Sequence, residues 1–442
     1  MYKSNKKTVI AFILATLFGS LVSAHAEDVK EEAWNAHFQT TYIWQTKPSF
    51  PALYTGDFSL RPEREKAYTF SATAAFGWRP WRGGELYFDP ELVQGVPLSE
   101  LRGLGGFPNG EQQKTSGPNP TLYRARLFLR QTWNHGGEKE AVESDANQLA
   151  GMVDKRRIVV TAGNLAVIDI FDNSSFAHDP RTQFLNWALL AHGAYDFAAD
   201  ARGYSWGAAI EYFYDDWAIR AGRFMQPAES NGLPLDTRIF THYGDQIELE
   251  HAHTIGDQPG KLRFLAFRNK ANMGGFRDAL ANAPNNGGVP DLSLVRKERV
   301  KYGFGINAEQ NLTPDTGIFA RASWNDGASE TFAFTEIERS LSAGAVMKGR
   351  AWNRGDDTVG IAFVRNGLSS AHRDYLAAGG HGAFIGDGKL NYRPESIVET
   401  YYSLNVAKHA WVTLDYQRIA NPAYNADRGP VNVGSMRLHA QY

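Results

Sequence analysis

Three arginines recur at short spacing in one strand-like segment: Arg124, Arg126 and Arg130. Read as a β-strand, the segment places all three on one face. The other face then carries Tyr123, Ala125, Leu127 and Leu129. A guanidinium group facing hydrocarbon costs about 2–4 kcal/mol near the middle of a membrane, so in a membrane strand the three arginines are expected to face water. They could form a ladder that donates hydrogen bonds to solute hydroxyls, or ion pairs that brace loops against a wall.

A second group of chemically versatile residues lies between positions 169 and 202. Its charged members are Asp169, Asp172, Asp179, Arg181, Asp196, Asp200 and Arg202, and its aromatic members include Phe171, Phe176, Phe184, Trp187, Tyr195 and Phe197. Charged groups beside aromatic faces suit recognition of a polar ring. We expect this segment to fold into a lumen, where Asp169, Asp172, Asp179, Arg181, Trp187 and Arg202 would line a pore. The alternative is an ordinary packed loop with an aromatic core and a turn at Asp179-Pro180.

Glu111 is a further candidate for the pore lining. It follows three glycines and the turn-forming pair Asn109-Gly110. Glu111 could pair with an arginine of the lumen, or it could belong to a solvated surface turn.

Other chemistries have little support in the sequence. Asp169, Asp172 and Asn173 do not follow the spacing of an EF-hand loop. The histidines lack the H-E-x-x-H spacing of a zinc site, and the chain has no cysteine. No pair of carboxylates is singled out for glycoside hydrolysis. We therefore predict no metal site, no cofactor and no catalytic residue.

The elements that must position these residues are strands with period-two alternation. The last residues of the chain place Met436, Leu438, Ala440 and Tyr442 on one face and Arg437, His439 and Gln441 on the other. Segments 68–78 and 300–308 alternate in the same way, with aromatic and aliphatic side chains on one face. An apolar face opposite a polar face, with an aromatic C-terminal residue, is typical of an outer-membrane β-barrel. The sequence marks about twelve strands clearly.

Composition agrees with one large β structure. The chain of 442 residues is 13% aromatic and has a formal net charge of −2. Its mean hydropathy of −0.40 argues against a helical membrane protein, whereas a barrel wall needs only alternate apolar residues. The lack of a basic surplus argues against nucleic acid as a partner. No linker or charge block divides the chain, so we predict a single domain over residues 27–442.

The first 26 residues are predicted to be a cleaved signal peptide. Lys3, Lys6 and Lys7 precede an apolar run from Val9 to Val22, and Ala24-His25-Ala26 is a small-residue cleavage site. The run is short for a membrane span. Secretion through the inner membrane and a place in the bacterial outer membrane follow from this prediction.

Longer irregular segments separate some of the predicted hairpins, at about 94–121, 168–203, 226–244 and 273–297. In a bacterial barrel the long loops lie on the extracellular side and can fold into the lumen.

Several segments resemble the OprB family of carbohydrate-selective porins. They are Phe107-Pro108-Asn109-Gly110-Glu111, the strand 126–132, the run Asp179-Pro180-Arg181-Thr182-Gln183-Phe184-Leu185-Asn186-Trp187, and Asn421-Pro422 followed by Asp427-Arg428-Gly429-Pro430-Val431. The similar segments extend from about Trp34 to Tyr442, nearly the whole predicted mature chain. The resemblance implies an antiparallel up-and-down barrel of sixteen strands that lets sugars diffuse across the outer membrane.

On this basis a small sugar and outer-membrane lipid are the expected partners. A homotrimer is one assembly that the sequence leaves open, and the identity of the sugar is not determined. Two alternatives remain: a channel for other small solutes such as organic acids, which the arginines would suit, and a secreted periplasmic sugar-binding protein or glycosidase on a large β scaffold.

Overall fold

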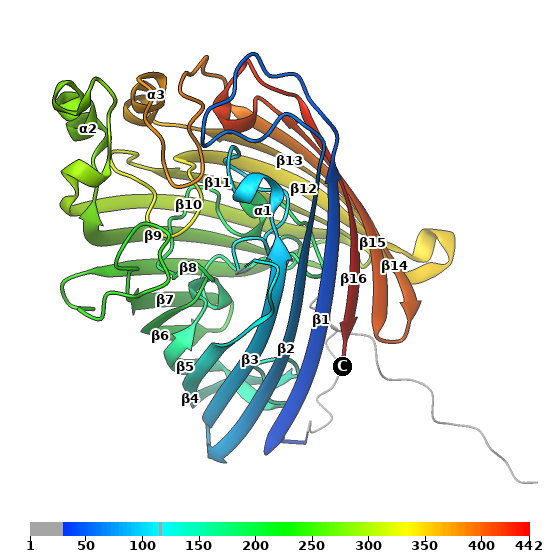
Figure 1. Cartoon of the computed structure of the whole chain (residues 1–442). Coiled ribbons are helices and arrows are strands. Elements are labelled where there is room, and N and C mark those ends of the chain that lie inside the picture. The colour runs from blue at the N-terminus through cyan, green and yellow to red at the C-terminus, as the bar shows by residue number, and fades with distance from the viewer. Residues whose placement is uncertain (1–29, 115–116) are drawn as a thin grey trace, which may run out of the picture.

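The computed structural model describes residues 30–114 and 117–442, and there the chain forms a closed barrel of sixteen antiparallel strands. Each strand pairs with its neighbours in sequence, and β1 pairs with β16 to close the ring (Figure 1). The predicted fold class is therefore confirmed. The predicted signal peptide lies outside the described residues and stays a prediction.

The strands are β1 Trp34–Lys47, β2 Glu65–Trp81, β3 Gly84–Val96, β4 Thr121–Val142, β5 Gly151–Leu165, β6 Ser205–Tyr214, β7 Trp217–Phe224, β8 Tyr243–Ile255, β9 Gln258–Met273, β10 Lys297–Thr313, β11 Thr316–Asn325, β12 Arg339–Gly349, β13 Arg354–Gly367, β14 Glu395–Ala407, β15 Ala410–Ala420 and β16 Val431–Gln441. The helices are α1 Trp187–Leu190, α2 Phe276–Asn282 and α3 Ser370–Ala377, with 3₁₀ turns η1 Leu98–Glu100, η2 Val167–Asp169, η3 Ala283–Asn286, η4 Ser293–Val295, η5 Arg350–Trp352 and η6 Pro422–Tyr424. No helix in the described ranges is both long and apolar enough to cross a bilayer.

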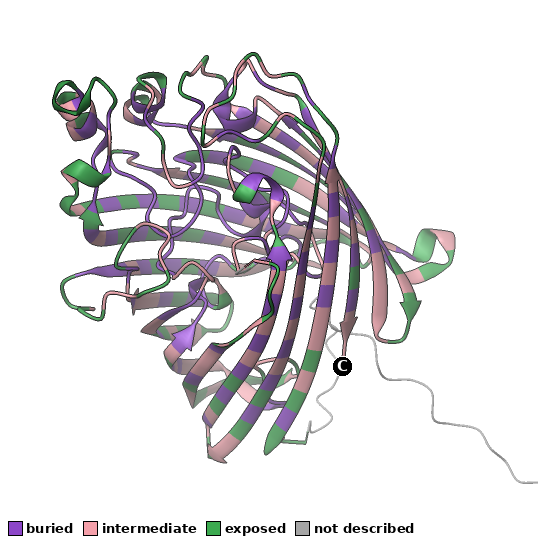
Figure 2. Cartoon of the chain, in the orientation of Figure 1, coloured by how far each residue is buried: buried purple, intermediate pink, exposed green. Residues whose placement is uncertain are grey.

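The two faces of the wall differ as the period-two patterns predict. In β2, Phe76 and Trp78 are exposed on the outside, whereas Thr69 and Thr73 are buried on the inside. The other predicted outward rows, in β10 and β16, point outward in the same way, and β6 shows the same alternation. Figure 2 shows the result as bands of buried and exposed residues along each strand. An apolar exterior with a polar interior allows a closed sheet to sit in lipid and still enclose water.

The connections at the two ends of the barrel differ in length. Eight connections of ten or more residues alternate with seven of eight or fewer, so the long ones share one end. We call this the loop end and the opposite one the turn end. The start of β1 and the C-terminus lie at the turn end, and α2 and α3 lie at the loop end (Figure 1). Long loops at 48–64 and 368–394 had no counterpart among the predicted irregular segments.

The longest loop, L3 (166–204), folds into the barrel and includes α1. Its polar groups bond to strands around the ring. The partners include Arg126 of β4, Glu248 of β8, Lys301 of β10, Arg321 of β11, Gln417 of β15 and Arg437 of β16. Phe184 and Trp187 of L3 are buried and pack against Phe319, Phe107 and Phe384. The predicted inward folding of this segment is confirmed, and its aromatics form the core of a plug.

A bulge in β4 changes which side chains face inward. Asp89 of β3 pairs with Arg126, but the next residue, Pro90, pairs with Arg124, so Ala125 is the extra residue. Proline has no N–H to donate to a ladder and occurs in sheets at such irregular points. The side chain of Asn164 donates a 2.7 Å hydrogen bond to the Ala125 carbonyl.

The bulge overturns the prediction for Arg124. Tyr123 and Ala125 now face inward together with Arg126, and Arg124 is exposed on the outside of the wall. Its guanidinium lies 5.0 Å from the ring centroid of Trp206, which belongs to the outward row of β6. The cost of an outward arginine falls to about 0–1 kcal/mol near a membrane interface, so this position near the loop end is tolerated.

Candidate functional site

A cavity of about 830 Å³ lies between L3, loop L2 (97–120) and the inner faces of the strands. Arg126, Asp169, Glu111, Lys114 and Arg202 line one side of it, where L2 and L3 contact β2, β3 and β4. Residues of the turn end, such as Asp356, Lys408 and Trp411, line the other side. The cavity therefore reaches from the loops inside the barrel to the turn end.

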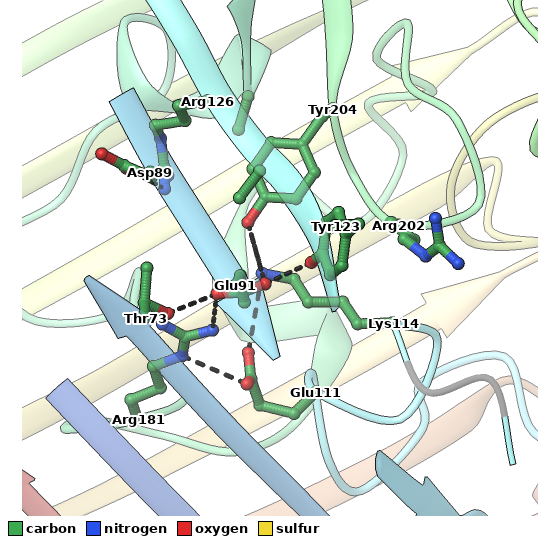
Figure 3. A network of polar contacts seen from close by, with 12 residues as sticks. Thr73, Asp89, Glu91, Glu111, Lys114, Tyr123, Arg126, Arg181, Arg202 and Tyr204 are labelled. Carbon is green, nitrogen blue, oxygen red and sulfur yellow. Dashed lines mark hydrogen bonds and ion pairs between the residues drawn. The ribbon is translucent and has the colours of Figure 1, made fainter. Parts of the chain in front are cut away.

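The polar network on this side of the cavity centres on Glu91 of β3 (Figure 3). Glu91 is fully buried and accepts 2.6 Å hydrogen bonds from the Thr73 hydroxyl and from the Arg181 guanidinium. Its other oxygen accepts from the hydroxyls of Tyr123 and Tyr204. A buried carboxylate is stable only when it is paired and hydrogen-bonded, and Glu91 meets this condition through partners on three strands or loops.

Arg181 ties L3 to this carboxylate. Its Nη2 bonds to Glu91, its Nε donates to Glu111 of L2 at 3.1 Å, and its Nη1 donates to Thr73 of β2 at 2.9 Å. Burial alone would lower the pKa of Arg181, but Glu111 and Glu91 outweigh it and raise that pKa well above its usual value. Glu111 is thus a buried partner of a lumen arginine, and the interpretation as a solvated surface turn is wrong.

Arg126 and Asp169 form the part of the network that faces the cavity. Nε and Nη2 of Arg126 donate to the two oxygens of Asp169 at 2.7 and 2.6 Å, and Nη1 lies 3.4 Å from Asp89. Burial opposes ionisation of Asp169, but Arg126 outweighs it and lowers the pKa of Asp169. The side chains of Arg126 and Asp169 are 19% and 28% exposed, so solute in the cavity can reach both.

Lys114 lies beside Arg126, with Tyr204 between the two cations. The Lys114 ammonium donates to the Tyr204 hydroxyl at 3.1 Å and lies 5.0 Å from the ring centroid, and the Arg126 guanidinium lies 5.3 Å from the same ring. Burial would lower the pKa of Lys114, but Tyr204, Glu91 and Glu111 raise it above its usual value. Lys114 therefore stays charged, and the ring of Tyr204 fixes the separation of two cationic groups.

Two other predicted arginines also line the cavity. Arg130 of β4 donates to the Asn147 carbonyl at 2.9 Å and lies 5.2 Å from the Tyr87 ring centroid. Arg202 lies 4.6 Å from the ring centroid of Tyr123. The cavity-facing arginines are thus Arg126, Arg130, Arg181 and Arg202, and the predicted ladder loses Arg124.

The remaining predicted residues have other positions. Asp172 is fully buried, away from the cavity, and accepts hydrogen bonds from Asn307 at 2.7 Å and Arg321 at 3.1 Å. Trp187 is 1% exposed, and its indole N–H donates to the Asn109 carbonyl at 2.8 Å. The expectation of a pore-lining contact is therefore wrong for Asp172, whereas Trp187 does border the cavity, although its side chain is almost fully buried. Asp179 lines the cavity and caps the turn at Arg181 and Thr182.

Sequence reasoning missed several members of the network: Thr73, Asp89, Glu91, Lys114 and Tyr204. One signal was present in β3, where Glu85, Asp89 and Glu91 alternate with Leu86, Phe88 and Leu92. Acidic residues at that spacing in an apolar strand indicate an inward polar row. Lys114 and Tyr204 lie in loops, where no period indicates a direction.

The charges that line the cavity nearly cancel. Seven basic and six acidic side chains are among the lining residues. Interspersed charges of both signs give many hydrogen-bonding groups without a strong net field. Such a lining suits an uncharged, hydroxyl-rich solute better than an anion.

Comparisons with known proteins agree with this geometry. Residues 59–442 match the family model described as "Carbohydrate-selective porin, OprB family". The chain is similar to the high pH structure of Pseudomonas putida OprB, with 15% identity and a TM-score of 0.69. The similarity covers 93% of this chain and 94% of the OprB chain. The low pH structure of the same protein gives 12% identity, coverage of 93% of both chains and a TM-score of 0.51.

A third solved structure is the outer membrane channel DcaP of Acinetobacter baumannii. It is 9% identical, covers 92% of this chain and 97% of its own, and has a TM-score of 0.50. At these identities the structures support the fold alone. Comparison with curated proteins gave no match.

Proposed function

The chain belongs to the OprB family of carbohydrate-selective porins, and on this premise we propose that sugars pass its narrow point by exchanging hydrogen bonds with Arg126, Lys114, Arg202 and Asp169. The protein is an outer-membrane porin through which sugars diffuse down their gradient. In bacterial barrels the short turns are periplasmic, so the loop end is extracellular and the turn end is periplasmic.

The observation that carries this proposal is a charged network with one buried side and one side open to the cavity. Glu91, Glu111 and Arg181 hold the loops in place, and Arg126 presents its remaining donors to the cavity. A guanidinium has five N–H donors, and the described contacts with Asp169 and Asp89 engage three of them. Two donors remain for a passing hydroxyl.

The expected affinity is compatible with transport. A hydrogen bond to a charged group contributes about 1.5–3 kcal/mol, so two such bonds contribute about 3–6 kcal/mol. A millimolar dissociation constant corresponds to about 4 kcal/mol. Binding of this strength guides a sugar through the narrow point and still permits rapid release.

The main alternative cargo is a small organic acid. The near balance of lining charges favours uncharged solutes, and the family favours carbohydrates. A periplasmic binding protein or glycosidase is not supported, because the family and fold are those of channels. We accordingly propose that the protein has no catalytic activity. A homotrimer remains a proposal for crosslinking to test.

The experiment is a comparison of solutes with the full-length protein reconstituted in membranes. Liposome swelling should be fast with glucose, slower with a disaccharide and slowest with benzoate. In planar bilayers, sugar added to the bath should reduce the ionic current in a saturable way. A protein that admits benzoate faster than glucose would refute the proposed cargo, and one that conducts without sugar block would refute the hydrogen-bonding site.

A further inference from the structure

The outward apolar rows of several strands end in a basic residue at the loop end. In β13 the row Val359, Ile361 and Phe363 ends in Arg365. In β15 the row Leu414 and Tyr416 ends in Arg418. A basic residue directly beyond the apolar row lies at the depth where hydrocarbon gives way to head groups.

Five arginines at or near the loop ends of the outward rows, which we call the rim arginines, are exposed on the outside of the wall. They are Arg124, Arg268, Arg339, Arg365 and Arg418. None of them has an ion-pair partner among residues 30–114 and 117–442. They have only neutral contacts, such as the 3.4 Å hydrogen bond from Arg418 to Asn432 and the 3.0 Å bond from Arg339 to the Leu368 carbonyl.

Three rim arginines form one cluster across β12 to β15. Arg365 pairs with Leu341, two residues from Arg339, which makes Arg339 and Arg365 diagonal neighbours about 7–8 Å apart at the backbone. Arg365 pairs with Ser396, and Arg418 pairs with Val398, so these two arginines lie two strands and two residues apart, at about 12 Å between backbones. The cluster therefore presents three guanidinium groups on four consecutive strands.

The acidic residues at the loop end form ion pairs with basic residues outside the rim set. Asp245 and Glu298, which also lie at the loop ends of their strands, are paired with Arg223 at 2.7 Å and Lys270 at 3.0 Å. The turn end has a different character, because its outward rows end in exposed tryptophans: Trp34, Trp78, Trp133 and Trp217. The rim arginines thus lie at the loop end, which faces the outer leaflet.

We propose that the rim arginines bind the phosphate groups of phosphorylated lipid head groups in the outer leaflet, with Arg339, Arg365 and Arg418 forming the main site. Arginine matches the geometry of a phosphate group with paired N–H donors. The apolar rows below the arginines would contact the acyl chains of the same lipid. One lipid would then satisfy both the charge of the rim and the apolar wall beneath it.

The test uses the detergent-purified full-length protein and diphosphoryl lipid A as the probe, with bound lipid measured by native mass spectrometry. Replacing Arg339, Arg365 and Arg418 together by Gln should weaken binding by about tenfold or more. The matched control is Arg350→Gln, because Arg350 is exposed at the turn end between β12 and β13 and should leave binding unchanged. Heat-modifiable migration on gels reports whether each variant is folded.

The source of the phosphate is tested separately. The same lipid without its phosphates should bind at least tenfold more weakly, and inorganic phosphate should not displace the lipid at millimolar concentration. Equal binding by the triple variant or by the phosphate-free lipid would overturn the proposal. Should the triple variant not fold, Arg365→Gln and Arg418→Gln singly should each weaken binding about threefold, and unchanged binding in both would overturn it.

Discussion

L3 is joined to the barrel wall by two aspartate–arginine ion pairs that lie in opposite environments. On one side, Asp172 meets Arg321 of β11 in full enclosure, with Asn307 and the backbone of L3 taking up the remaining oxygen sites. On the other side, Asp169 meets Arg126 of β4 at the surface of the cavity. Both pairs join an aspartate of L3 to an arginine of the wall. The two aspartates are three residues apart in the loop.

The difference between these pairs is access to water. An enclosed ion pair has no donor to offer a solute, and breaking it leaves a buried charge without a partner. A pair at a cavity surface is screened and keeps unused donors. The first pair is therefore an anchor of the loop, and the second is suited to contact with a passing sugar.

The largest expected effect comes from breaking the enclosed pair. In Arg321→Ala, the buried carboxylate of Asp172 loses its charged partner, and docking of L3 should weaken by about 3–5 kcal/mol. The measurement is limited proteolysis within 166–204 together with single-channel noise, and both should rise.

The matched control is the exposed pair of Arg156 and Asp215, at the turn end. Arg156→Ala should leave L3 resistant to protease, because water screens an exposed ion pair. Equal sensitivity of L3 in the two variants would contradict the distinction between enclosed and exposed pairs.

Acidification should weaken the same anchor. Burial, with Arg321 and Arg263 nearby, lowers the pKa of His192 to about 4, although Asp172 acts in the opposite direction. Below its ordinary pKa of about 6.5 the undocked His192 takes up a proton, whereas the docked one does not until about pH 4. Docking is thus most stable above pH 6.5 and weakens as the pH falls towards 4.

The measurement is the protease sensitivity of L3 between pH 7 and pH 4.5. His192→Gln should flatten the profile, since glutamine does not titrate. If the variant keeps the full pH dependence of the natural chain, another group is responsible.

A smaller effect is expected at the cavity surface. Arg126→Ala removes the two donors that remain for the sugar, and the dissociation constant from sugar block of the current should rise at least tenfold. The barrel should remain folded, because Glu91 and Arg181 still hold L3. An unchanged dissociation constant would mean that Arg126 only holds L3 in place and does not contact the sugar.

The smallest effect is expected outside the wall. Arg124→Ala should leave sugar block and conductance unchanged, because this side chain lies over Trp206 on the exterior. A loss of sugar block similar to that of Arg126→Ala would mean that the bulge in β4 does not turn Arg124 away from the lumen.

The sequence predicted the wall of the barrel better than the site. Alternation in β2, β10 and β16 is a local property, so it indicated which side chains face outward without knowledge of their neighbours. The prediction failed in β4, where Pro90 of the adjacent strand forces a bulge and shifts the alternation by one residue. The shift was invisible in β4 itself, because its cause lies in another strand.

The candidate site was predicted in part. Arg126, Arg130, Asp169, Asp179, Arg181, Arg202 and Glu111 all line the cavity. Trp187 borders it too, with little exposed area, whereas Asp172 of the same loop is fully enclosed. Glu91 was overlooked, although the alternation of its own strand would have placed it inside.

What the amino-acid sequence determined by itself is a closed wall with an apolar exterior and a polar interior, because the period of a strand fixes the side of every residue. Only the tertiary structure decided which charged residues of L3 meet the cavity and which are enclosed. Those choices depend on contacts between residues far apart in the chain, such as Arg181 with Glu91 and Asp172 with Arg321. No local sequence pattern determines whether such an ion pair will be accessible to water.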